Sequence, residues 1–438
     1  MKTLSKICIH PWSHLAFNPN GDIWPCCHQR NDPYVLGNMN TDNPIEVFNG
    51  EKMNRIRRLM LQDKLPDDAC AKCIHFESNN VKSPRQSALT NHYAQDVLDE
   101  IKKNTNEDGS LKDVKIRYWD LRWSNLCNLS CVMCGPNWSS KWTNEINNMV
   151  KHYPDGVDDS TGSIEFIKSQ VKDQKVDTVP NVEWIDKHIN DVEYIYFAGG
   201  EPILMQEHWY IMDKLVELKK FNVKIKYNTN MSKLEHNGKN ALDYWRHWSH
   251  KDLIIEGSID ETGARAEWIR YGTDWKTTQS NIQTLVKENI KTQPIISVGC
   301  YNVLRLPELM KELYDLYYNP KVRVNMALNP VLNNEWRINV LSDKVKKRAK
   351  KQLRALEQSI PDAPLSWHSQ FKKIYNELDK PHSEKNARSF LRYSAIIDLN
   401  RGTNVFDAIP EMEQVNTMYN DYYTQVKEEH YELRRMEK

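Results

Sequence analysis

The sequence has no excess of charge of either sign, and it contains no long apolar run. Its 60 Lys and Arg residues face 59 Asp and Glu residues, so the formal net charge of the 438 residues is +1. Such a chain has no broad field to attract nucleic acid or an anionic membrane surface. No window approaches the ~18 apolar residues that a spanning helix needs, and the mean hydropathy is −0.73. We therefore expect neither nucleic acid nor a membrane as a partner.

A secretory signal is also not expected. The apolar stretch at residues 7–17 is interrupted by His10, Pro11, Ser13 and His14, and it lacks a small-residue cleavage site. We therefore expect a cytoplasmic protein, in which the nine cysteines are thiols and metal ligands rather than disulfides. The length exceeds that of one typical domain, so several structural parts are expected.

Three cysteines lie close together after a strand-like run at residues 114–121. Cys127, Cys131 and Cys134 form a C-x3-C-x2-C array. Thiolates suit zinc or an iron–sulfur cluster, but closed zinc sites and ordinary four-iron clusters take four protein ligands. Three ligands leave one position open, where a chelating small molecule can bind. The alternative is a loop with incidental or zinc-binding cysteines.

This array resembles the signature loop of the radical S-adenosylmethionine (SAM) enzymes. The resemblance implies that Cys127, Cys131 and Cys134 hold a [4Fe-4S] cluster and that SAM chelates the open iron through its amino and carboxylate groups. An electron from the reduced cluster would then split SAM into methionine and a 5′-deoxyadenosyl radical, which abstracts hydrogen from a substrate. Family members usually carry an aromatic residue before the third cysteine. Here it is Met133, whose flexible thioether can cover the same adenine face.

The next predicted strand, at residues 192–198, runs into two glycines, which let the backbone approach a ligand closely. After a three-cysteine loop, this turn resembles the GGEP motif that binds the amino end of SAM. The same resemblance implies SAM contacts at the polar ends of two later strands and by an arginine that pairs with the SAM carboxylate. Polar strand ends also serve as simple helix caps, and this alternative stays open. The implied SAM-binding residues are Gly199, Gly200, Glu201, Pro202, Asn228, Asn230, Ser258, Asp260 and Arg270.

Five cysteines lie in the first 80 residues. A turn ending at Gly21, between β-like runs at residues 14–17 and 22–24, predicts a small hairpin that brings Cys8 and Cys26 together. A helical segment at residues 45–61 would return the chain so that a C-x2-C pair completes a four-thiolate site. The full set is Cys8, Cys26, Cys70 and Cys73. By spacing alone, this site could hold structural zinc.

The spacing C-x12-G-x4-C followed by C-x2-C resembles the SPASM/twitch module of radical SAM enzymes, which implies an auxiliary [4Fe-4S] cluster. Only Cys26 keeps the G-x4-C spacing, and Cys27 remains the alternative ligand. In the best-known members this module follows the SAM domain, whereas here it precedes it.

The predicted fold is of the α/β class. Six strand-like runs separated by crossovers predict a parallel sheet with helices outside it, and the resemblance implies a partial (β/α)6 TIM-type barrel with its site at the carboxyl ends of the strands. The predicted strands span residues 114–121, 192–198, 223–229, 253–259, 295–301 and 322–328. The expected parts are an auxiliary-cluster module at 1–82, a helical linker at 83–113 with a helix at 88–103, the barrel at 114–330, and a helical C-terminal extension at 331–438. Residues 139–191 are a candidate lid or partner surface, and residues 398–403 are candidates for lining the substrate cavity.

The function that follows is a radical SAM enzyme in which the auxiliary cluster assists. The resemblance implies a peptide or protein side chain, or a small polar metabolite, as substrate, and a low-potential electron donor such as flavodoxin or ferredoxin. Fold and cofactor do not choose among oxidation, crosslinking, epimerisation and methylation. The alternative is a zinc-stabilised binding protein whose cysteine sites are structural. Cys300, within an apolar run, is expected to be a core residue.

Overall fold

The computed structural model describes residues 5–28, 34–79, 82–152, 182–322, 324–360 and 365–436. The chain divides into two units. Unit 1 comprises Met1–Asn125, Lys175–Asn228 and Ala241–Leu253, and unit 2 comprises Leu126–Gln174, Thr229–Asn240 and Ile254–Lys438. Most of the candidate lid at 139–191, namely residues 153–181, lies outside the described residues.

The predicted N-terminal hairpin is confirmed. Strands β1 (His14–Phe17) and β2 (Asp22–Trp24) pair antiparallel, with Ala16 opposite Trp24. Gly21 in the turn has φ +89°, and a Cβ there would lie 2.2 Å from Asn40 Nδ2. The positive φ favours glycine at this position, and a larger residue would also displace the Asn40 side chain. The short strand β3 (Gly37–Asn38) pairs with β2 and continues the sheet.

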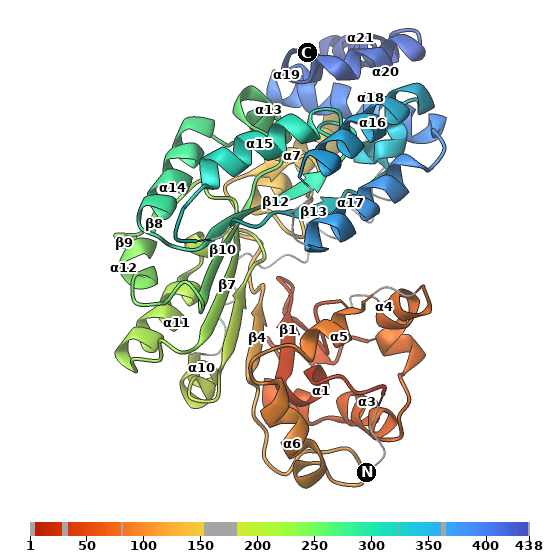
Figure 1. Ribbon diagram of the computed structural model, residues 1–438. Coiled ribbons are helices and arrows are strands. Elements are labelled where there is room, and N and C mark those ends of the chain that lie inside the picture. Colours follow the sequence, from red (N-terminus) through yellow and green to blue (C-terminus); the bar gives the residue numbers. More distant parts are fainter. Residues whose placement is uncertain are drawn as a thin grey trace. The chain divides into compact units, whose positions relative to one another are not determined.

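Short helices surround the hairpin in unit 1 (Figure 1): α1 (His10–Ser13), α2 (Pro44–Phe48), α3 (Glu51–Leu61), α4 (Asp67–Ser78), α5 (Pro84–Ala88) and α6 (Ala94–Asn104). The predicted helix at 45–61 is two helices, because the extended Gly50 caps the start of α3. The predicted helix at 88–103 begins only at Ala94, since α5 ends at Ala88.

Arg57 joins three of these helices. Its side chain is fully buried on α3. It donates hydrogen bonds to the carbonyl oxygens of Pro11 (2.7 Å) and Phe48 (2.7 Å) and to Asn54 Oδ1 (2.8 Å). Burial lowers the pKa of Arg57 to about 9. The guanidinium therefore satisfies backbone acceptors that a small helical module would otherwise bury unpaired.

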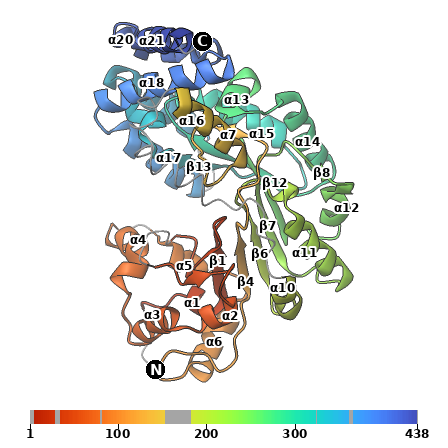
Figure 2. The ribbon, with the colours of Figure 1, turned by 180° about the vertical axis from the view of Figure 1, so that it is seen from behind.

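Unit 1 contains one sheet in the order β7-β6-β4-β1-β2-β3. Strands β4 (Tyr118–Leu121), β6 (Tyr194–Phe197) and β7 (Lys224–Thr229) are parallel. The hairpin is part of this sheet, because β1 pairs in parallel with β4 and His14 lies opposite Tyr118. Figure 2 shows β4, β6 and β7 side by side. The N-terminal cysteine-rich region and the first parallel strands thus share one sheet.

The two faces of β6 and β7 differ in burial. One face carries Phe197 and Tyr227 and packs against α11 (Gln206–Glu217) and α12 (Ala241–Trp245). Tyr227, for example, lies with its ring centroid 5.2 Å from that of Trp245. Trp184 of α10 (Val182–His188) packs against Trp119 of β4, with ring centroids 4.6 Å apart. The opposite face carries Tyr194, Tyr196 and Lys226, which are only half-buried. Such alternation is expected for strands with helices on one face.

Unit 2 contains the parallel strands β10 (Leu253–Ser258), β12 (Thr292–Val298) and β13 (Ala327–Pro330), which pair in that order. Its crossover helices are α13 (Gly263–Ile269), α14 (Trp275–Lys287) and α15 (Leu306–Tyr317). All six predicted strands are present, although the last begins at Ala327 rather than at 322, where Val322 forms an isolated bridge with Asn319. The parallel α/β core is confirmed, and its closure into a partial barrel stays a prediction.

The region after β13 is helical, as predicted. Its main helices are α16 (Asp343–Ser359), α17 (Leu365–Leu378), α18 (Glu384–Arg401) and α21 (Tyr422–Met436). Helix α18 is buried on most of its surface and ends at Gly402, which has φ +68°. The shorter elements of this region are α19 (Val405–Ala408), α20 (Glu413–Met418), η2 (Asn334–Trp336), η3 (Ile338–Val340) and η4 (Pro410–Met412). Earlier in the chain, between β7 and α12, β8 (Glu235–His236) and β9 (Lys239–Asn240) form a separate two-stranded sheet. Among the described residues, no helix combines the length and apolarity needed to cross a membrane.

Candidate iron–sulfur sites

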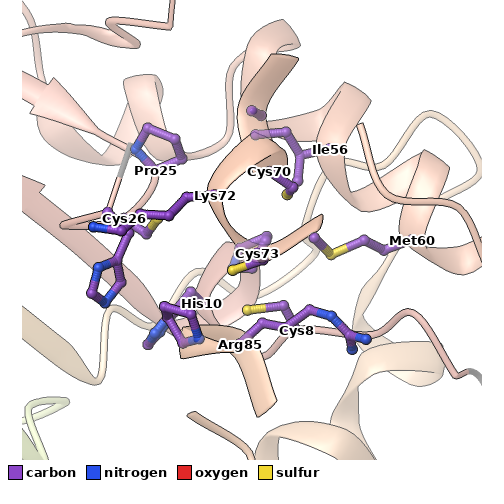
Figure 3. Close-up of a pocket in the computed structure, with 14 residues that line it drawn as sticks. Cys8, His10, Pro25, Cys26, Ile56, Met60, Cys70, Lys72, Cys73 and Arg85 are labelled. Carbon is purple, nitrogen blue, oxygen red and sulfur yellow. The ribbon is translucent and has the colours of Figure 1, made fainter. Parts of the chain in front are cut away.

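Four cysteines line one pocket in unit 1 (Figure 3). Cys8 precedes α1, and Cys26 follows β2. Cys70 and Cys73 lie three residues apart on α4, so their side chains project from the same helix face. Met60, His10 and Arg85 also line the pocket. The structure therefore brings together all four cysteines of the predicted auxiliary set, from three separate segments of the chain.

Burial determines the state of these thiols when no metal is bound. It raises the pKa of Cys8, Cys70 and Cys73, and for Cys8 and Cys70 the neighbouring cysteines raise it further. Arg85 acts in the opposite direction on all three. Its guanidinium is fixed by Glu77 at 2.6 Å. A metal centre here would displace protons as it binds, and the buried Arg85 charge would offset part of the thiolate charge.

Cys27 lies outside the four-cysteine pocket. It instead lies near Tyr118, whose pKa is raised first by burial and then by Asp120, Tyr194 and Cys27. The geometry thus favours Cys26 over Cys27 as the fourth thiol of the set.

The three-cysteine loop lies in unit 2 and is fixed by β-pairing and by the start of α7 (Ser140–His152). Strand β5 (Ser130–Cys131) pairs antiparallel with β11 (Arg270–Tyr271), so Arg270 lies opposite Cys131. The indole of Trp142 donates to the Cys131 carbonyl oxygen at 2.8 Å, and the hydroxyl of Ser140 accepts from the Cys127 amide at 3.2 Å. The backbone of the loop is therefore held by a strand pairing and by hydrogen bonds with the start of α7.

Two of the residues predicted to contact SAM, Asn230 and Arg270, lie beside cysteine sulfurs of this loop. Asn230 Nδ2 lies 3.9 Å from Cys127 Sγ and donates to Asn128 Oδ1 at 3.0 Å. Arg270 Nη1 lies 3.7 Å from Cys131 Sγ. Burial raises the pKa of Cys131, and the charge of Arg270 opposes that shift. Donors directed at cysteine sulfur are a common means of tuning an iron–sulfur cluster.

Arg270 already has a carboxylate partner in this structure. Its Nη2 lies 2.7 Å from Asp260 Oδ2, and Asp260 is almost fully buried. Asp260 Oδ1 also accepts from the backbone amide of Ser297 at 2.6 Å. Two residues that the sequence suggested as separate SAM contacts are therefore one ion pair beside Cys131.

The glycine-rich turn belongs to unit 1. Gly199 has φ +106°, and a Cβ there would lie 2.9 Å from the Ser124 carbonyl oxygen. Gly200 donates its amide to the same oxygen at 3.0 Å. Glu201 is fully buried and caps the short helix η1 (Pro202–Leu204) through the Ile203 amide. The turn is thus held tightly against the segment that follows β4.

The other sequence-predicted residues are placed as follows. Asn228 lies within β7 in unit 1, Ser258 is the last residue of β10, and Met133 is half-buried in the three-cysteine loop. Cys300 is buried in the core of unit 2, as expected. No three His, Cys, Asp or Glu side chains of the described ranges could together hold a single metal ion. The ligands of a four-iron cube sit on different irons, so this finding does not bear on a cluster.

Two residues at 398–403 have structural partners, while the cavity lining predicted for this segment stays a prediction. Asp398 is buried and accepts hydrogen bonds from the Trp268 indole (2.8 Å) and the Tyr423 hydroxyl (2.7 Å), so it ties helices together. Arg401 reaches the three-cysteine loop. Sequence reasoning missed this contact, because no local motif links an arginine at the end of a C-terminal helix to a loop some 270 residues earlier.

Comparison with known proteins identifies the N-terminal region. Residues 8–74 match the SPASM family, described as an iron–sulfur cluster-binding domain, and the matched range contains all four cysteines of the pocket. The predicted resemblance to this module is confirmed. No curated protein matches the chain.

Several solved structures show weak likeness. One is anSMEcpe with bound AdoMet and Kp18Cys peptide, with 15% identity and a TM-score of 0.33, covering 55% of this chain and 60% of that one. Another is SuiB of Streptococcus suis bound to precursor peptide SuiA, with 11% identity and a TM-score of 0.34, covering 77% and 72%. The chain thus spans about three fifths of the length of the anSMEcpe structure. At such TM-scores the likeness supports no inference about this chain.

Proposed function

We propose that this chain is a radical SAM enzyme with one SAM-binding [4Fe-4S] cluster and one auxiliary [4Fe-4S] cluster. The observation that carries the proposal is the presence of two distinct cysteine sets. Four thiols converge on one pocket within a region matching an iron–sulfur domain, and three thiols lie on a separate fixed loop. A closed site and a site with one open ligand position differ in what they can do.

At the three-cysteine loop, the protein would hold and tune the cluster. Cys127, Cys131 and Cys134 would be its ligands. When bound, the cluster would supply the electron that cleaves SAM and so generates the radical. Arg270 would donate toward the Cys131 thiolate, and Asp260 would keep the guanidinium in that orientation. Leu129 and Val132 are buried and would exclude water from one side of the loop.

SAM would occupy the open position. Gly199, Gly200, Glu201 and Pro202 would approach its amino end, since a turn with a left-handed glycine offers backbone without side chains. Because Arg270 is paired with Asp260, the SAM carboxylate would either share this ion pair or depend on the iron alone. Asn228 and Ser258 remain candidate contacts to the rest of SAM, and Met133 to its adenine.

The closed site in unit 1 would leave no iron for SAM. Cys8, Cys26, Cys70 and Cys73 would ligate all four irons, so the auxiliary cluster would relay an electron or help to hold the substrate. The substrate class is a peptide or protein side chain or a small polar metabolite, and the donor is a low-potential protein such as flavodoxin or ferredoxin.

The first experiment is metal analysis of protein purified without oxygen and reconstituted. We expect about eight irons per chain, as two four-iron clusters. The variant Cys127→Ala/Cys131→Ala/Cys134→Ala should retain about half of them. Cys300→Ala is the matched control, because Cys300 is a buried cysteine outside both sets, and it should keep them all. Tightly bound zinc in place of iron would instead support the zinc-stabilised binding protein.

The second experiment tests the open position. SAM added to the reduced, reconstituted protein should change the electron paramagnetic resonance (EPR) signal of one cluster, and 5′-deoxyadenosine should accumulate. The triple variant should show neither effect. If the iron-loaded wild-type protein fails to bind SAM in this titration, the three-cysteine loop does not hold a SAM-binding cluster.

A further inference from the structure

Arg401, the last residue of α18, connects the C-terminal helices to the three-cysteine loop. Its side chain is 1% exposed. Its Nη2 donates to the carbonyl oxygen of Ser130 at 2.7 Å, and its Nε pairs with Glu145 Oε2 at 2.8 Å. Ser130 immediately precedes the ligand candidate Cys131. A buried arginine thus binds the peptide group that links Ser130 to Cys131.

The guanidinium is also enclosed between aromatic rings. It lies 4.4 Å from the centroid of Tyr271 on β11 and 5.0 Å from that of Trp142 on α7. Tyr271 pairs with Ser130 in the small sheet, and Trp142 bonds to the Cys131 carbonyl oxygen. Arg401 therefore contacts both elements that fix the loop as well as the loop itself. Several independent contacts thus fix the orientation of the Arg401 side chain, as expected for a residue that positions a functional loop.

The contact also has an electrostatic side. Glu145 is 12% exposed, and it accepts from the Ser130 hydroxyl as well as from Arg401. The Arg401 Nη1 atom has no hydrogen-bond partner among the described residues. A buried cation beside Cys131 favours added negative charge there, because the surroundings screen it poorly. The paired carboxylate of Glu145 acts with the opposite sign.

We propose that Arg401 is a positioning residue for the SAM-binding cluster, one that fixes the Ser130–Cys131 peptide and, through its charge, makes reduction of that cluster easier. The inference rests on the proposed function. Reduction here adds one electron, supplied by a low-potential donor of the flavodoxin or ferredoxin class. No bond is made or broken, and no proton is transferred at Arg401.

The test uses the reconstituted full chain and an EPR-monitored redox titration of the cluster that responds to SAM. In Arg401→Gln, the ratio of reduced to oxidised cluster at a fixed applied potential should fall about tenfold, as expected for removing one poorly screened charge. In Glu145→Gln the ratio should rise. A merely structural role for the pair would move both variants in the same direction, so opposite signs are the signature of the charge effect.

Two further variants separate position from charge. Arg401→Lys keeps the charge but loses the forked hydrogen bonding, so its ratio should stay near that of wild type while an iron chelator removes the cluster faster. Arg388→Gln is the matched control, since Arg388 lies on the same helix, is about half exposed and forms an ion pair with nearby Glu384. It should behave as wild type in both measurements.

The outcomes are distinct. A wild-type ratio and wild-type chelator resistance in folded Arg401→Gln would overturn the inference. If Arg401→Gln does not fold, Glu145→Gln decides, and an unchanged or lowered ratio in that variant would overturn the charge effect. The auxiliary cluster should titrate unchanged in every variant. Absence of any SAM-responsive cluster in wild type would instead refute the proposed function itself.

Discussion

Glu335 provides a test of the structure that needs no cofactor. It lies in η2 after β13, is 2% exposed, and its Oε1 has no hydrogen-bond partner among the described residues. Burial raises the pKa of Glu335 to about 7. The titratable groups that face it are Tyr393 and Cys300, whose own pKa values are raised by burial, so both stay neutral near pH 7.

The sign and size of the effect follow from linkage. The folded state holds the Glu335 proton more tightly than the unfolded chain does. The contribution of Glu335 to the unfolding free energy is therefore fully present below about pH 4.5 and is lost as pH rises through about 7. Between pH 5 and pH 8 the loss amounts to about 2.5 kcal/mol for this group alone. Glu335→Gln removes the charge and should therefore stabilise the protein at pH 8 and change little at pH 5.

The assay is urea unfolding of the apo protein under reducing, anaerobic conditions, followed by circular dichroism at pH 5 and pH 8. The quantity of interest is the difference between wild type and Glu335→Gln in the pH dependence of the unfolding free energy. Glu308→Gln, an exposed position on α15, is the control and should parallel wild type. The opposing outcome is that the unfolding free energies of wild type and Glu335→Gln change by the same amount between pH 5 and pH 8, within about 0.5 kcal/mol, a typical error of such a comparison. That result would show that the pKa of Glu335 is not raised in the folded protein.

Two further predictions concern unit 1. Arg57→Met should lower the unfolding free energy by about 3 kcal/mol, because the Pro11 and Phe48 carbonyl oxygens lose their donor, whereas Arg58→Met on the same helix should cost less than about 1 kcal/mol. Denaturant unfolding measures both, and equal losses would contradict the role assigned to Arg57. Gly199→Ala should weaken SAM binding at least about tenfold in a titration, because the added Cβ would meet the Ser124 carbonyl oxygen. Gly238 also has a positive φ but has open space around it, so Gly238→Ala should bind SAM as wild type does. Equal affinities in the two variants would show that the close approach at Gly199 is irrelevant to SAM.

The helices and strands were predictable from the sequence, but their end residues and the pairing of distant strands were less so. The parallel strands were predictable because short apolar runs alternate with helical segments. The break at Gly50 was missed because helical apolar spacing continues across it, although the extended backbone of Gly50 starts a new helix. The pairing of β1 with β4 was not predictable, since local patterns carry no information about which distant strand is adjacent.

The candidate site shows the same division. The predicted hairpin and helix, together with the resemblance to the SPASM/twitch spacing, grouped the four thiols that line one pocket. Asn230 and Arg270, predicted as SAM contacts, lie beside cysteine sulfurs of the three-cysteine loop, and their contact with SAM stays a prediction. That Asp260 and Arg270 form an ion pair depends on three-dimensional proximity and burial, which no motif encodes. Arg401 and Glu145 escaped notice for the same reason.

The parallel pairing of β1 with β4 has a consequence for biosynthesis. His14 and Tyr118 are neighbours in the sheet but are separated by roughly 100 residues, so at typical translation rates β1 leaves the ribosome about 5–20 s before β4. During that interval one edge of β1 lacks its strand partner. β1 therefore gains its partner β4 only after all four cysteines of the pocket, the last of which is Cys73, have been synthesised.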